Sequence, residues 1–136
     1  MIYIDSNVFV HAALSQTKEG EHARDILDAL ARGGLSGATS VATVDEVIWA
    51  VQKVRGKEAS AQIAEAMFQL RGLEFVSLDL AVMALAVEIY RHEWLKPRDA
   101  MHLATLRLKK IGSILSTDSD FDKIKGIKRI DLSKPV

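Results

Sequence analysis

Short strand-like runs alternate with longer segments of helical periodicity along the chain. The strand-like runs lie at residues 2–5, 35–39, 73–77, 114–116 and 128–132. The first of them, Ile-Tyr-Ile-Asp, is rich in β-branched and aromatic residues and shows no polar alternation, which is typical of a strand buried on both faces. Strands that alternate with helices predict an α/β fold with a central parallel sheet covered on both sides.

The helical segments have apolar residues at intervals of three and four, and most of them end at glycine. The predicted helices cover residues 8–14, 23–31, 44–54, 58–70, 79–94 and 97–111, and stop signals follow at Gly33-Gly34, Gly56, Gly72 and Gly112. Pro97 is well suited to the first turn of the last helix. The 136 residues contain no repeat and no linker, so the sequence predicts a single domain, residues 1–136.

Composition excludes several kinds of site. Cysteine is absent, so disulfides, thiolate zinc sites and cysteine nucleophiles are excluded. The longest charge-free apolar run, Leu80 to Val87, is far shorter than the roughly 20 residues of a membrane span. With no targeting segment visible after Met1, we expect a cytoplasmic protein without a membrane partner.

The net charge of zero conceals an asymmetry. The 18 basic and 18 acidic residues divide into 6 and 9 in residues 1–68, and 12 and 9 in residues 69–136. The second half is therefore locally basic, and the overall balance neither indicates nor excludes a nucleic acid partner.

Acidic residues at four places in the chain follow strands or begin helices. Asp5 ends the first strand, Asp118 follows the strand at 114–116, Asp99 begins the Pro97 helix, and Asp45-Glu46 begins the helix at 44–54. The carboxyl ends of parallel strands lie at one edge of a sheet, so these acids are expected to converge. Converging carboxylates repel one another unless a proton or a cation lies among them. Oxygen ligands without cysteine favour Mg²⁺ or Mn²⁺, which activate water for phosphodiester hydrolysis.

Each acid alone also has a purely structural interpretation. Asp5 and Asp99 could be helix N-caps, and Asp118 and Asp120 could be turn residues. The functional interpretation therefore depends on their convergence rather than on any one of them.

Four segments in order resemble the PIN domain family. They are YIDSNV at residues 3–8, DEV at 45–47, PRDAMHLA at 97–104 and STDSDF at 116–121. The length is similar to that of the free-standing VapC-like members. The resemblance implies a three-layer α/β/α fold and an endoribonuclease that depends on Mg²⁺ or Mn²⁺. It also implies an RNA substrate, a homodimer, and a toxin whose partner is an antitoxin.

The resemblance also assigns residues by position. It implies a catalytic set of Asp5, Glu46, Asp99 and Asp118, of which Asp5, Asp99 and Asp118 hold the metal and Glu46 completes the shell or orients the attacking water. Supporting polar residues would be Ser6, Asn7, Thr117 and Asp120.

Two assignments remain open. Helical periodicity favours Asp45 over Glu46 as the second acid, because Glu46 lies nearly opposite the apolar centre of the Val44, Val47 and Ile48 stripe, whereas the family pattern favours Glu46. Asp120 is an alternative to Asp118, and is interpreted as the cap of the short helix that contains Phe121.

Other conspicuous residues are given structural roles. The four histidines are scattered without metal-ligand spacing, and they are predicted to be structural. Trp49, Phe68, Phe75 and Trp94 are predicted to be core or dimer contacts. Basic residues near the third motif either bind RNA phosphates or form a solvated helix face: Arg98, Arg107, Lys109 and Lys110.

Two other functions compete with the ribonuclease. A phosphatase of the haloacid-dehalogenase type also begins with a strand that ends in Asp, but it needs a second Asp two positions later, where this chain has Asn7. A non-catalytic PIN-fold module would bind RNA or protein without cleaving it. The presence of all four acids argues against this second alternative.

Overall fold

A computed structural model describes residues 1–134, and its described strands form one parallel sheet. The strands are β1 (Ile2–Ile4), β2 (Gly37–Ser40), β3 (Leu73–Val76), β4 (Ser113–Leu115) and β5 (Lys128–Ile130). Their order is β3-β2-β1-β4-β5, and every neighbouring pair is parallel. The predicted central parallel sheet is confirmed, with strand bounds that shift by one or two residues.

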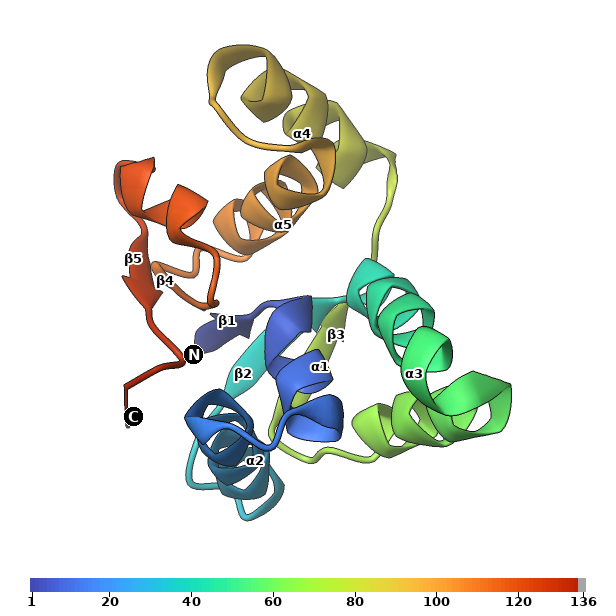
Figure 1. Ribbon diagram of the computed structural model, residues 1–136. Helices are drawn as coiled ribbons and strands as arrows, with labels where there is room; N and C mark the ends of the chain where they lie inside the picture. The colour runs from blue at the N-terminus through green and yellow to red at the C-terminus, as the bar shows by residue number, and fades with distance from the viewer. Residues whose placement is uncertain (135–136) are drawn as a thin grey trace.

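Helices cover both faces of this sheet (Figure 1). One layer contains α1 (Ser6–Leu14), α2 (Lys18–Ala31) and α3 (Val41–Phe68), and the other contains α4 (Leu80–His92) and α5 (Pro97–Leu108). A short 3-10 helix, η1 (Ser119–Lys123), connects β4 to β5. This is the three-layer α/β/α architecture that the resemblance implied.

Two cores lie on opposite faces of the sheet because successive strand residues point in opposite directions. Tyr3 packs into the core beneath α4 and α5, together with Leu103 and Phe121. Its neighbour Ile4 packs into the other core beneath α1, α2 and α3, with Val8 among its neighbours. A strand buried on both faces has no polar side, which explains the absence of alternation in the sequence of β1.

The helix boundaries differ most from the predictions at α2 and α3. Helix α2 begins at Lys18, five residues before the predicted start at residue 23. The predicted helices at 44–54 and 58–70 are two halves of the 28-residue α3, bent at Gly56, whose φ of 85° is not helical. Glycine adopts this left-handed conformation without a side-chain clash, so the chain turns there and continues. The first strand ends at Ile4, and Asp5 is the N-cap of α1.

The sheet order reverses direction at β1, which lies between β2 and β4. In open α/β sheets, ligands bind beyond the carboxyl ends of the strands at such a reversal. Asp5 directly follows β1 and Ser116 directly follows β4, so the fold places both residues at this crevice. Among the described helices, none combines the length and the apolar character needed to cross a membrane.

Of the four large aromatic residues predicted to be core or dimer contacts, three do not lie in the core of the single chain. Trp49, Phe68 and Trp94 are 52%, 58% and 93% exposed, whereas Phe75 is half-buried. In α3 the buried residues are Thr43, Val47 and Val51, and Trp49 lies about 200° around the helix from Val47.

Candidate active site

Three carboxylates meet at the crevice. Asp99 lies in the first turn of α5, Asp118 follows β4, and Asp120 lies in η1. One carboxylate oxygen from each lies within 4.8 Å of the other two, and all three residues are half-buried. We call these residues the acidic cluster. Asp5 is not a member of it.

Asp5 instead lies at the centre of a hydrogen-bond network beside the acidic cluster. It is 3% exposed, and both of its oxygens accept hydrogen bonds. Oδ1 accepts from the Ser6 backbone N–H at 2.7 Å, and Oδ2 accepts from Ser116 Oγ at 2.6 Å and from Asn7 Nδ2 at 3.2 Å. These donors fix the position of the carboxyl group at the end of β1.

Asn7 and Ser116 join the ends of β1 and β4. The Asn7 amide group donates to Ser116 Oγ at 3.1 Å and accepts from the Thr117 backbone N–H at 3.3 Å. Ser116 Oγ also accepts from the Asp118 backbone N–H at 3.0 Å. Ser6 and Asn7 therefore contact the site acids through their side chains, whereas the described contact of Thr117 is made by its backbone. Ser116 was not among the predicted site residues.

The electrostatic state of Asp99 reflects the crowding of acids. Burial, the hydrogen bond and charge of Asp118, and the charge of Asp5 together raise the pKa of Asp99 from 3.8 to about 7. At neutral pH this carboxyl is therefore divided between its protonated and ionised forms.

Glu46 is the acid of the Asp45-Glu46 pair that faces the site. Its Oε2 accepts from Ser6 Oγ at 2.9 Å, and its Oε1 lies 2.6 Å from His102 Nε2. Asp45 is exposed to solvent. The argument from periodicity is therefore wrong, because in the first half of α3 the buried residues are Thr43, Val47 and Val51 rather than the Val44, Val47 and Ile48 stripe.

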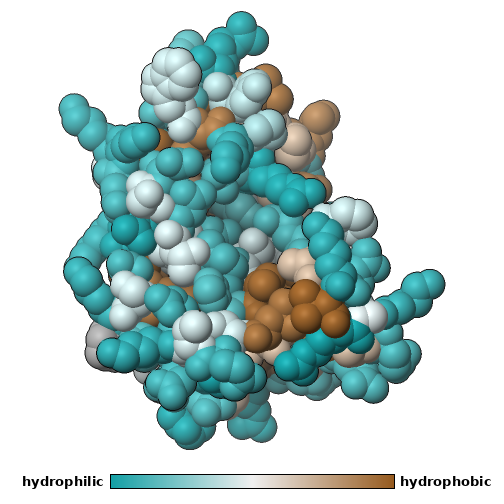
Figure 2. Space-filling view, in the orientation of Figure 1, coloured by the Kyte–Doolittle hydropathy of each residue, from teal (hydrophilic) through white to brown (hydrophobic). Residues whose placement is uncertain are grey.

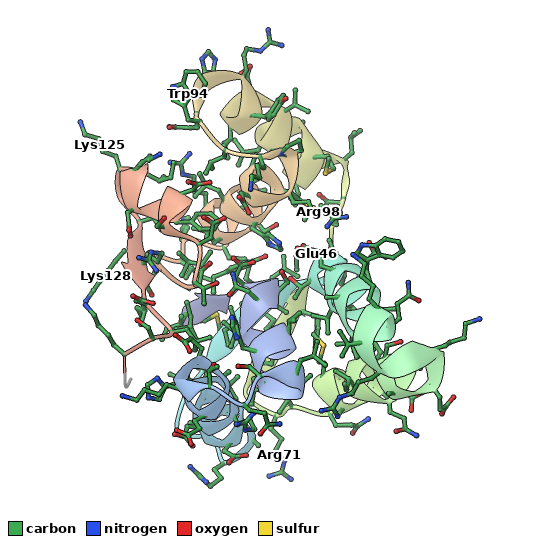
Figure 3. All side chains as sticks on the ribbon, viewed as in Figure 1. Glu46, Arg71, Trp94, Arg98, Lys125 and Lys128 are labelled. Carbon is green, nitrogen blue, oxygen red and sulfur yellow. The ribbon has the colours of Figure 1, made fainter. Side chains whose placement is uncertain are left out.

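The charge of Glu46 is stabilised despite its partial burial. Burial opposes ionisation, but the hydrogen bond and charge of His102, the Ser6 hydroxyl and the charge of Arg98 outweigh it, so the pKa of Glu46 is below its ordinary value. Figure 3 shows Glu46 at the start of α3 and Arg98 at the start of α5 on facing elements. Asp99 and Glu46 thus have pKa values displaced in opposite directions within one site.

The predicted capping role of Asp120 is wrong. Asp118 is the N-cap of η1, and its Oδ1 accepts from the Asp120 backbone N–H at 2.9 Å. The Asp120 side chain is therefore free to join the acidic cluster, where Lys123 Nζ lies 4.0 Å from its Oδ1.

His102 contacts the site, although the histidines were predicted to be structural. It is 1% exposed, and its ring nitrogens lie 2.6 Å from Glu46 Oε1 and 2.6 Å from Tyr3 Oη. Burial opposes the charged ring, but the hydrogen bond to Glu46 and the charges of Asp5, Glu46 and Asp99 raise the pKa of His102 above 6.5. A sequence signal existed, because residues three apart in a helix share a face, and His102 follows Asp99 by three.

The donor set fits a small hard divalent cation. The acidic cluster offers only oxygen ligands, which suits Mg²⁺ or Mn²⁺. The raised pKa of Asp99 shows that this cluster is short of positive charge, which such an ion would supply.

Replacement of Asp99 by Asn is expected to stabilise the protein when chelator removes divalent metal. The folded state holds the Asp99 proton up to about pH 7, whereas the unfolded chain releases it near pH 3.8, so stability falls as pH rises between these values. At about pH 8, we expect Asp99→Asn to be more stable by about 1–2 kcal/mol after solvent screening at this half-exposed site, or about 3–6 °C in Tm.

Thermal melts at several pH values in EDTA test this expectation. The advantage of Asp99→Asn should shrink as the pH falls and almost disappear below about pH 4, where the wild-type carboxyl is protonated in both the folded and the unfolded states. An equal gain at both pH values would contradict carboxylate repulsion as its cause.

Comparison with known proteins identifies a family match. The family model for the PIN domain matches residues 2–127. Ribonuclease VapC13 of Mycobacterium tuberculosis is 25% identical over 134 residues, which are 96% of this chain and 99% of that protein.

Solved structures share the fold at lower identity. VapC20 of Mycobacterium tuberculosis, described as a sarcin–ricin loop cleaving toxin, superposes with a TM-score of 0.74 at 18% identity, covering 90% of this chain and 93% of that chain. A chain of a toxin–antitoxin complex from Klebsiella pneumoniae superposes with a TM-score of 0.69 at 20% identity, and the match covers both chains completely.

Proposed function

Because this chain belongs to the PIN domain family, we propose that it is a metal-dependent endoribonuclease of the VapC type that hydrolyses RNA phosphodiester bonds. The observation that carries the proposal is the acidic cluster at the sheet reversal, with an ionised Glu46 beside it. Its similarity to VapC13 and its superposition with VapC20 support a ribonuclease rather than another member of the family.

The proposed metal site comprises Asp99, Asp118 and Asp120, with Asp5 beside them. A bound Mg²⁺ or Mn²⁺ supplies polarisation of a phosphate oxygen and a water molecule of lowered pKa. Asp5 is included because its negative charge acts on Asp99, although its oxygens already accept hydrogen bonds from Ser6, Asn7 and Ser116.

Glu46 would orient the attacking water in this proposal. Its carboxylate is ionised and lies beside the acidic cluster, so it offers acceptor lone pairs to a water molecule at the site. Arg98 faces the same carboxylate, and it would attract the RNA backbone to this side of the crevice.

We also propose that the enzyme is a toxin held by an antitoxin, because a neighbour of the same fold comes from a toxin–antitoxin complex. Helices α1, α2 and α3 border a groove of about 340 Å³ that could receive an apolar segment of that partner. Its lining includes Phe9, Ala12, Ala13, Leu27, Ile63 and Met67. The brown area between α1 and α3 in Figure 2 shows this apolar surface.

We propose further that the protein is a homodimer joined through α4. Leu80, Met83, Val87 and Tyr90 of α4 recur at intervals of three and four, and Trp94 lies two residues past the end of the helix; all five are at least 41% exposed. We call these five residues the α4 stripe. Such spacing is that of a helix–helix seam, and exposed apolar patches of this kind mark interaction sites. Brown residues at the upper right of Figure 2 lie over α4.

The competing functions have less support. In the phosphatase alternative, residue 7 would be a second acid, whereas Asn7 donates a hydrogen bond to Asp5. The non-catalytic module has the same fold and the same acids, so only an activity measurement separates it from the nuclease.

Purified protein is expected to cleave single-stranded RNA with added Mg²⁺ or Mn²⁺ and to lose this activity in EDTA. Cleavage should return when excess Mn²⁺ is added, because the carboxylates are the proposed ligands. A labelled RNA pool with sequencing of the products would report both rate and cleavage position. RNA binding without metal-stimulated cleavage in any buffer would support the non-catalytic module instead.

A further inference from the structure

A buried chain of hydrogen bonds connects the sheet to Glu46 through His102. On one side of the ring, Nε2 lies 2.6 Å from Glu46 Oε1; on the other, Nδ1 lies 2.6 Å from Tyr3 Oη. Tyr3 is fully buried and His102 is 1% exposed, so water does not compete for these groups. The catalytic assignments above give neither side chain a role.

Tyr3 connects this chain to the start of α3, the helix that holds Glu46. Its hydroxyl accepts from the Ser40 backbone N–H at 3.2 Å, and Ser40 is the N-cap of α3, with its Oγ accepting from the Ala42 N–H at 3.1 Å. Burial raises the pKa of Tyr3, so its hydroxyl keeps its proton. The phenol thus joins β1, the first turn of α3 and the α5 histidine at one point.

The direction of the bond to Glu46 is the same in both protonation states of the ring. In the neutral ring, the Tyr3 hydroxyl donates to Nδ1, which leaves the ring proton on Nε2. In the imidazolium, both nitrogens carry protons. In each case Nε2–H donates to Glu46 Oε1, and Ser6 Oγ donates to Oε2. Donors at both oxygens fix the plane of a carboxylate that ends a flexible side chain.

We propose that His102, held by Tyr3, is a positioning residue that fixes the Glu46 carboxylate in the orientation needed for RNA cleavage. This inference rests on the proposed function, because it needs Glu46 to act in the reaction. His102 Nε2 also lies 3.7 Å from Asp5 Oδ1, so the same nitrogen is close to two carboxylates of the site.

Paired substitutions at His102 separate a positioning role from packing. Gln can place an amide N–H toward Glu46, whereas Leu fills similar space without a donor. For His102→Leu we expect kcat to fall about 10- to 100-fold, on the scale of a lost charge-assisted hydrogen bond, with KM changed less than about 3-fold. His102→Gln should recover most of that loss. His22→Gln is the matched control, because that half-buried histidine binds the Leu132 carbonyl away from the site.

Two further variants keep the test informative if His102→Leu does not fold. Tyr3→Phe retains the buried ring and should lower kcat about 3- to 10-fold at unchanged KM, the scale of one lost neutral hydrogen bond. If Tyr3 and His102 act through Glu46, then Tyr3→Phe in a Glu46→Gln background should cost nothing further. Full kcat in both His102→Leu and Tyr3→Phe would overturn the positioning role, as would multiplicative losses in the double variant.

Failure of the proposed function gives a different result. The nuclease site is wrong if wild-type protein shows no metal-stimulated cleavage, or if Asp99→Asn keeps full activity. The hydrogen-bond chain can then still be tested in the absence of RNA. In that case, ¹³C NMR of Glu46 gives the decisive measurement. Its carboxyl pKa should rise on loss of the His102 donor, and an unchanged value would refute the inference.

Discussion

Asp99→Asn should reduce RNA cleavage about 10²- to 10³-fold or more at saturating RNA and Mn²⁺, since a metal ion contributes several kcal/mol to transition-state charge stabilisation. The substitution removes a charged ligand from the acidic cluster while leaving an amide of nearly the same shape. The same variant should be more stable than wild type in chelator. Removal of the Asp99 charge relieves the repulsion among the carboxylates and also weakens metal binding.

Single-turnover cleavage of labelled RNA, with Tm measured on the same preparations, tests this pair of effects. Asp45→Asn is the matched control, since it removes an exposed carboxylate one residue from Glu46 and should leave the cleavage rate unchanged. A second signature is the response to metal: added Mn²⁺ should raise the Tm of wild type more than that of Asp99→Asn. Cleavage by Asp99→Asn at the wild-type rate would show that the proposed site is wrong.

Val87→Glu should convert a dimeric protein into a monomer. Val87 lies at the centre of the α4 stripe, and it is 52% exposed in the single chain. In a two-fold symmetric pair of antiparallel α4 helices centred on Val87, this residue faces its own copy. The substitution would therefore place two like charges together in an apolar seam, and should raise the dimer Kd about 10²- to 10³-fold or more.

A second copy is the proposed occupant because the exposed face of α4 is apolar over most of its length. In this pairing the small Ala84 lies opposite the large Tyr90, and the only polar side chains of the helix are Glu88, Arg91 and His92, near its carboxyl end. Sedimentation velocity over a concentration series measures the effect. Val54→Glu serves as control, because it adds the same charge at a 68% exposed valine on α3.

Other results would reject the α4 dimer. If wild-type protein remains monomeric at about 100 µM, its dimer Kd is too high for a stable interface. An unchanged dimer in Val87→Glu would place the interface elsewhere. If only binding of the antitoxin were lost, the stripe would be the surface of that partner instead.

The sequence predicted the architecture of this protein and the convergence of two of its acids, Asp99 and Asp118. Hydrophobic periodicity is a local property of the chain, so it predicted strands that alternate with helices and a sheet covered on both faces. The convergence of Asp99 and Asp118 followed from the rule that parallel strands end at one edge, because that rule needs only the order of the elements. Local spacing also placed Pro97 in the first turn of α5.

Only the tertiary structure decided which side chains touch. Glu46 rather than Asp45 faces the site because packing against the sheet sets the rotation of α3, and the apolar residues visible in the sequence did not mark its buried face correctly. Asp120 joins the acidic cluster because Asp118 takes the capping role. His102 meets Tyr3 across 99 residues of sequence, and no local pattern encodes such a contact. Hydrophobic pattern reports which residues avoid water, whereas hydrogen bonding and pKa depend on atoms that meet only after the elements pack.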